Sequence, residues 1–172
     1  MYLSGESGKH PTFGMSAVSK RPVTDPEPGL RQRRVQTRWM AITRLNPERL
    51  HRTAGYAHVT IVDSRRLAVL AGQCPLDRDG SLVGRGDFLN QVDQIVANAT
   101  EALTAAGTSA ENVVRSVIYV VSDDPGVLSS VWDRLTGSGI GPAFTTASTL
   151  LGVAALGYRD QLVEVDRTAA LP

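Results

Sequence analysis

A short apolar run places the strongest constraint on how this chain can fold. Residues 67–71 read Leu-Ala-Val-Leu-Ala and end at Gly72. A run without a polar position is typical of a strand that is covered on both faces, and Pro75 ends its pairing soon after. The backbone at Gly72 has no side chain to keep a small ligand away. The alternative is that Gly72 only accommodates a β-bulge.

Composition restricts the classes of protein to which the chain can belong. Its 172 residues, of which 42% are hydrophobic, suit one globular domain. We find neither the roughly 20 consecutive apolar residues of a membrane span nor the apolar core of a signal peptide, so we expect a cytoplasmic protein. The single cysteine, Cys74, has no internal partner, and the three histidines are not spaced as metal ligands. We therefore expect no metal and no cofactor.

Charge is distributed unevenly along the sequence. Residues 1–39 contain seven Lys or Arg against three acidic residues and are rich in Gly, Pro and Ser, which predicts a disordered basic N-terminal extension. The natural start could instead be Met40. Residues 40–172 form the predicted domain, with 11 basic and 14 acidic residues. This balance disfavours a nucleic-acid partner for the domain, although the basic run 31–38 could contact phosphate.

Hydrophobic periodicity predicts alternating strands and helices. Residues 57–63 alternate as a strand, and the short connection to 66–72 predicts an antiparallel hairpin between these two segments. A helix is expected over 87–106, with Asp87 as its N-cap and Gly107 at its C-terminus. The remaining predicted elements are a strand over 113–121, a helix that begins at Asp124-Pro125, and strands over 148–154 and 161–169. The order β-β-α-β-α-β-β predicts an α+β sandwich with helices on one face of a mixed sheet.

Two helices can cover only one face of such a sheet. The predicted strands nevertheless carry apolar groups on both faces, for example Val69 and Leu70. We therefore expect the second face to pack against another copy of the chain, and no membrane is involved.

Several segments taken together resemble the RidA/YjgF family. They are Gly55-Tyr-Ala57, Ala71-Gly-Gln-Cys-Pro-Leu-Asp77, the 87–107 helix that ends Ala-Ala-Gly, Asn112-Val-Val-Arg-Ser-Val-Ile-Tyr-Val120, and Leu162-Val-Glu-Val-Asp166. The resemblance covers nearly all of 41–170. It implies a chorismate-mutase-like fold, a homotrimer and a small-molecule cleft between subunits. Members of the best-known branch of this family hydrolyse reactive enamines and imines to ammonia and a 2-oxo acid. Other members are described as ribonucleases or as binders of small metabolites.

The resemblance also implies roles for individual residues. Tyr56 would line the cleft, and the backbone of Gly72, with Gln73 beside it, would meet the substrate. Glu164 would orient the attacking water, and its place between two valines would make it a more effective base. The alternative for Glu164 is an ordinary strand residue that points to solvent.

The sequence departs from the family pattern at the substrate-binding arginine. In active deaminases this arginine pairs with the substrate carboxylate, but here the matching position is Ser148 or, in a second alignment, Phe144, and no arginine lies between Arg134 and Arg159. Ser129 likewise replaces an asparagine of the second helix. We therefore expect a neutral or differently anchored ligand rather than a 2-iminocarboxylate.

Three functions are compatible with these observations. The first is hydrolysis of imines or enamines by water that Glu164 activates. The second is non-catalytic binding of a small molecule between subunits, and the third, less favoured, is RNA cleavage. Cys74 lacks an evident base in the sequence, so we expect an inert thiol rather than a nucleophile.

Overall fold

The computed structural model describes residues 40–172, so the predicted disorder of residues 1–39 concerns positions outside the described part of the chain. The strands are β1 (Ala41–Leu45), β2 (Val59–Asp63), β3 (Arg66–Gln73), β4 (Val113–Val120), β5 (Ala147–Gly152) and β6 (Val163–Leu171). The helices are α1 (Phe88–Ala105) and α2 (Pro125–Thr136), with short 3-10 helices η1 (Ala110–Asn112) and η2 (Gly141–Phe144).

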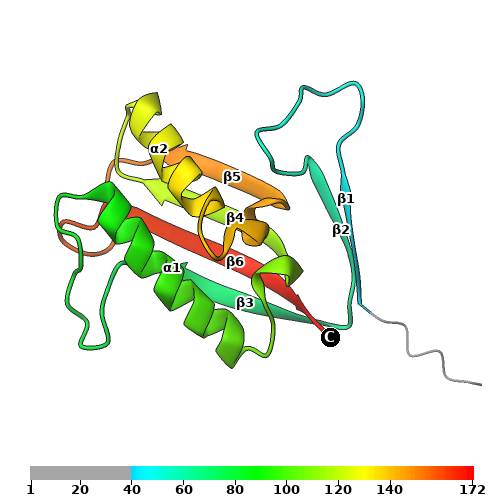
Figure 1. Cartoon of the computed structure of the whole chain (residues 1–172), viewed down its shortest axis with the longest axis horizontal. Coiled ribbons are helices and arrows are strands. Elements are labelled where there is room, and N and C mark those ends of the chain that lie inside the picture. The colour runs from blue at the N-terminus through cyan, green and yellow to red at the C-terminus, as the bar shows by residue number, and fades with distance from the viewer. Residues whose placement is uncertain (1–39) are drawn as a thin grey trace, which may run out of the picture. The chain divides into compact units, whose positions relative to one another are not determined.

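A mixed sheet with the strand order β3-β6-β4-β5 forms the centre of the domain, and both α-helices lie on the same face of it (Figure 1). Strand β6 pairs antiparallel with β3 and β4, whereas β4 and β5 are parallel. The predicted α+β class, with helices on one face of a mixed sheet, is confirmed.

Both helices begin where their capping residues predict. The Asp87 side chain accepts hydrogen bonds from the backbone N–H groups of Leu89 and Asn90, and Asp124 accepts one from Gly126 at the start of α2. Such caps satisfy N–H groups that have no partner within the helix. After α1 the chain turns at Gly107, whose φ of 71° favours glycine.

The core lies between the helices and the sheet. Val92, Ile95, Ala99 and Leu103 of α1 are fully buried in it. They pack with Val131 and Leu135 of α2, Ile118 and Val120 of β4, and Val163 and Val165 of β6. This apolar packing is the main source of the domain's stability, and it fixes β6 at the centre of the sheet.

The predicted hairpin between 57–63 and 66–72 is wrong. Strand β2 pairs antiparallel with β1, from Ala41↔Asp63 to Leu45↔Val59, and β3 pairs with β6 instead. The Ser64 hydroxyl, between β2 and β3, donates to the backbone carbonyl of Leu171 at 2.9 Å. This bond directs the chain onto the end of β6, where β3 finds a long antiparallel partner. The short connection between β2 and β3 therefore does not make these two strands pair with each other.

Strand β1 was not expected from the sequence, and with β2 it forms a separate two-stranded sheet. Thr60 of β2 connects this sheet to the main one, because its hydroxyl lies 2.7 Å from the Thr146 hydroxyl and accepts from the backbone N–H of Ala147 at 2.9 Å. The small sheet is thus held next to the start of β5.

The face of the main sheet opposite the helices is open in the described chain. On β3, Val69 is 82% and Leu67 is 53% exposed, whereas Leu70 packs against the core. The expectation of apolar side chains on both faces of β3 is confirmed. None of the helices between residues 40 and 172 has the length and apolar character that crossing a membrane requires.

Candidate functional site

Glu164 on β6 lies directly against Gly72 on β3. A Cβ atom built on Gly72 would lie 1.9 Å from Glu164 Oε1, so only glycine leaves room for the carboxylate. The pairing of β3 and β6 is also irregular between Leu70 and Gln73. Gly72 therefore lies in an irregular part of the pairing and faces the glutamate at the same time. The bulge interpretation of this glycine is confirmed, and the approach of a ligand to its backbone stays a prediction.

Gln161 and Cys74 contact the same carboxylate oxygen. Glu164 Oε2 accepts from Gln161 Nε2 at 2.9 Å and lies 3.5 Å from Cys74 Sγ. Gln161 is buried, and its own Oε1 accepts from the Tyr158 N–H at 3.0 Å. Because both donors contact Oε2, the carboxylate is held in one orientation and Oε1 retains its acceptor capacity.

Burial and, secondly, the neighbouring charge of Glu164 raise the pKa of the Cys74 thiol to about 11. The thiol is therefore protonated at neutral pH, and only the thiolate is an effective nucleophile. This agrees with the prediction of an inert thiol.

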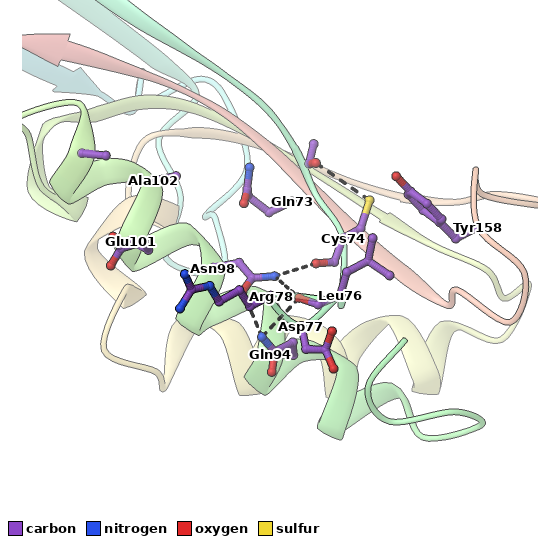
Figure 2. Close-up of a pocket in the computed structure, with 12 residues that line it drawn as sticks. Gln73, Cys74, Leu76, Asp77, Arg78, Gln94, Asn98, Glu101, Ala102 and Tyr158 are labelled. Atoms are coloured by element: carbon purple, nitrogen blue, oxygen red, sulfur yellow. Dashed lines mark hydrogen bonds between the residues drawn. The ribbon is translucent and has the colours of Figure 1, made fainter. Parts of the chain in front are cut away.

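Next to Gly72 and Cys74 the surface is hollowed by about 840 Å³ between the end of β3 and the flank of α1. Figure 2 shows Gln73, Cys74 and Tyr158 along one side and Gln94, Asn98 and Glu101 along α1. The amide of Gln73 donates to the Ala71 carbonyl at 3.1 Å. A small polar molecule would meet backbone groups and amides here, next to Cys74, whose thiol contacts Glu164.

Two side chains of α1 hold the loop that follows β3. Asn98 Nδ2 donates to the carbonyls of Cys74 and Leu76 at 2.9 and 2.8 Å (Figure 2), and Gln94 Nε2 donates to Asn98 Oδ1 at 2.9 Å. These residues and Gln161 were missed in the sequence analysis. The spacing of Gln94 and Asn98, one helical turn apart within an amphipathic helix, was the available signal.

The other predicted site residues lie elsewhere in the same chain. Tyr56 bonds His51 Nε2 through its hydroxyl at 2.9 Å, and its ring packs edge-on against Trp132 at 6.3 Å. Ser148 donates to the Phe144 carbonyl at 3.3 Å, and Ser129 donates to the Pro125 carbonyl within α2. One chain thus brings together Gly72, Gln73 and Glu164, but not Tyr56, Ser129 and Ser148.

A second carboxylate, Asp166, lies two residues further along β6 and has different partners. It accepts from the Tyr119 hydroxyl at 3.2 Å and lies 3.7 Å from Arg115. Burial, and then the charge of Asp166, raise the pKa of Tyr119. Among residues 40–172 no group of three or more His, Cys, Asp or Glu side chains is arranged to hold a metal ion.

The comparisons with known proteins point to one family. The family model described as Endoribonuclease L-PSP matches residues 47–171. Protein DfrA of Myxococcus xanthus is 30% identical over 115 residues, which cover 66% of this chain and 83% of DfrA.

Solved structures give the same result. YyfB of Yersinia pestis, a protein of unknown function of the conserved Rid protein family, superposes with a TM-score of 0.70 at 33% identity, over 76% of this chain and 98% of YyfB. YyfA from the same organism and family has a TM-score of 0.54 at 25% identity, over 76% of this chain and 100% of YyfA. The α+β sandwich is thus the chorismate-mutase-like fold that the resemblance implied.

Proposed function

The chain belongs to the Rid/YjgF family, whose model is described as Endoribonuclease L-PSP, and from this premise we propose that it hydrolyses a small imine or enamine with water activated by Glu164. The imine is the tautomer that reacts. The water oxygen adds to the imine carbon while Glu164 takes a proton from the water. That proton passes to the nitrogen and gives a carbinolamine. The hydroxyl proton of the carbinolamine is then transferred to its amino group, through Glu164, as the C–N bond breaks, and the products are a carbonyl compound and ammonia.

The position of Glu164 against Gly72 is the observation that carries this proposal. The carboxylate is half-buried on β6 and is oriented by Gln161 at 2.9 Å, as a general base must be if it is to meet one water in a fixed direction. Gly72 leaves the room that this carboxylate occupies, and the same glycine lines the neighbouring hollow with Gln73 and Cys74, from which a substrate would approach. A glutamate that pointed to bulk solvent would offer neither feature.

The proposed site is completed by other copies of the chain in a homotrimer. Support comes from the exposed apolar side chains of β3, where Val69 is 82% exposed, and from the separation of Tyr56, Ser129 and Ser148 from Glu164 within one chain. A neighbouring copy that packs on the open face would place its own residues at the edge of the Glu164 site. A cytoplasmic location belongs to the same proposal.

Ammonia release tests the catalytic role. Imines are generated in situ by an amino-acid oxidase, and the native chain is compared with Glu164→Ala and with the matched control Asp133→Ala, which removes an exposed carboxylate of α2. We expect Glu164→Ala to lower the rate at least about 100-fold, the usual range for loss of a general base, and Asp133→Ala to retain most of it. Equal rates for the native chain and Glu164→Ala would exclude the mechanism.

A non-catalytic binder of a small molecule is the second candidate. It is favoured by the absence of an arginine from residues 135–158, because a carboxylate substrate then lacks the bidentate partner expected there. Native mass spectrometry of the purified protein with a metabolite library tests it. A retained ligand without turnover would support binding alone, and an empty protein across the library would argue against it.

RNA cleavage is the least favoured alternative. The described part of the chain has 14 acidic against 11 basic residues, which disfavours contact with phosphates.

A further inference from the structure

Arg167 is a buried cation in the core of the domain. Its side chain is only 1% exposed. On β6 it lies on the same face of the strand as Val163, Val165 and Ala169, which are fully buried under the helices. Within the described chain, Nε, Nη1 and Nη2 have no hydrogen-bond partner. A guanidinium can donate five hydrogen bonds, so this burial leaves an unusual number of donors unused.

The groups shown to contact or face Arg167 are an aromatic ring and hydroxyls, and no carboxylate in the described chain is hydrogen-bonded to its guanidinium. Its Cζ lies 5.3 Å from the centre of the Phe144 ring. In the sheet, Ser116 is opposite both Arg167 on β6 and Ser148 on β5. The hydroxyls of Ser116 and Ser148 donate to the carbonyls of Ala143 and Phe144. The adjacent Asp166 points to the other face, where it binds Tyr119.

The Arg167 guanidinium stays positively charged although no anionic group is bonded to it in the described chain. Burial lowers the pKa of Arg167 to about 10, against a smaller opposing effect of Asp166. At neutral pH the group is therefore still protonated. Contact with one aromatic face offsets only a small part of the cost of removing a cation from water. Buried charges in folded proteins are normally paired with an opposite charge.

We propose that Arg167 binds one small monoanion, enclosed between β6, β4 and η2 on the helix side of the sheet. A monoanion matches the single positive charge. The flat fork of donors suits the two oxygens of a carboxylate, and a halide would satisfy the same charge. The site is separate from Glu164, which lies against Gly72, and so it does not depend on the proposed hydrolysis.

Thermal unfolding of the native full-length chain tests the proposal. Sodium chloride, sodium formate and sodium acetate are each compared with sodium gluconate, whose anion is too large for an enclosed site, at the same ionic strength. At about ten times Kd, a ligand that binds only the folded state should raise the Tm by about 4 °C. A rise with formate and acetate alone identifies a carboxylate site, and a rise with chloride alone identifies a halide site. A Tm that is the same in all four salts overturns the proposal.

Variants connect the effect to this residue. Arg167→Met keeps the length of the side chain and should abolish the anion-dependent rise in Tm. The matched control Arg134→Met removes an exposed arginine that pairs with Asp93 and should keep the rise. A rise that persists in Arg167→Met would contradict the assignment.

If Arg167→Met does not fold, the native protein still decides the question. Crystals grown in sodium bromide should give an anomalous peak within hydrogen-bond distance of the Arg167 guanidinium, and crystals grown in sodium formate should give carboxylate density there. Absence of both overturns the proposal.

Discussion

At the scale of single residues, the contact between Cys74 and Glu164 links the reactivity of one side chain to the charge of the other. The pKa of Cys74 is raised from 9.0 to about 11 by burial and then by Glu164. The proportion of thiolate at pH 8 is therefore about 100-fold lower than in an unperturbed cysteine. The Cys74 thiol should consequently report on the charge state of the proposed catalytic carboxylate.

We expect iodoacetamide to modify Cys74 about 100-fold more slowly in the native chain than in urea at pH 8. Only the thiolate reacts with iodoacetamide, and the raised pKa lowers the proportion of thiolate in the native chain. The native rate should keep rising above pH 9 rather than level off there. Glu164→Gln should increase the native rate by removing the negative charge. The rates are measured by mass spectrometry, with Asp166→Asn as the control. Identical rates for the native chain and Glu164→Gln would show that the two groups are not coupled.

The sequence predicted part of this local chemistry. Gly72 and Glu164 were expected together, and they are in contact. Arg167 was not singled out, although Val163, Val165 and Ala169 share its face of the strand and the alternation therefore marks it as an arginine on an apolar face. The family pattern has its arginine at the position of Phe144 or Ser148. The structure brings Arg167 over Phe144 from a different strand, a juxtaposition that no local pattern encodes.

At the scale of secondary-structure elements, α1 holds the loop after β3 through Gln94 and Asn98, so its stability affects the Glu164 site. We expect Asp87→Ala to lower the free energy of unfolding by about 1 kcal/mol, since two N–H groups lose their cap. Asp123→Ala removes the same charge from an exposed position and should change it by less than about 0.5 kcal/mol. Urea denaturation measures both. Equal losses would show that the cap contributes nothing specific.

The elements were predictable to different degrees. Both helices have strong periodicity and local caps, and they begin where the sequence places them. The pairing of β2 and β3 was predicted wrongly, because strand partners depend on contacts between residues far apart in the sequence. The bond from Ser64 to Leu171 joins positions 107 residues apart. Strand β1 lies in a short segment without a clear alternation, so its pairing with β2 was not visible either.

At the scale of the whole molecule, the open face of the main sheet combines two surfaces. Along β3 it is apolar, with Leu67 and Val69 exposed. Along β6 and β4 it carries Asp166 with Tyr119 and Arg115. Apolar side chains this exposed favour contact with another protein surface, and the charged groups beside them would fix the orientation of that contact. This combination suits a symmetric assembly of identical chains better than unspecific aggregation.

The assembly is tested at Val69, which is 82% exposed in the single chain. Sedimentation velocity at micromolar concentration should show three copies for the native chain and a monomer for Val69→Glu, because three glutamates buried in the interface would each lose their hydration. Thr100→Glu introduces the same charge on the exposed side of α1 and should remain trimeric. If the monomeric Val69→Glu chain also loses ammonia release while its circular dichroism is unchanged, the proposed site requires residues from a second copy. A native chain that sediments as a monomer would instead confine any activity to the residues around Glu164 in one chain.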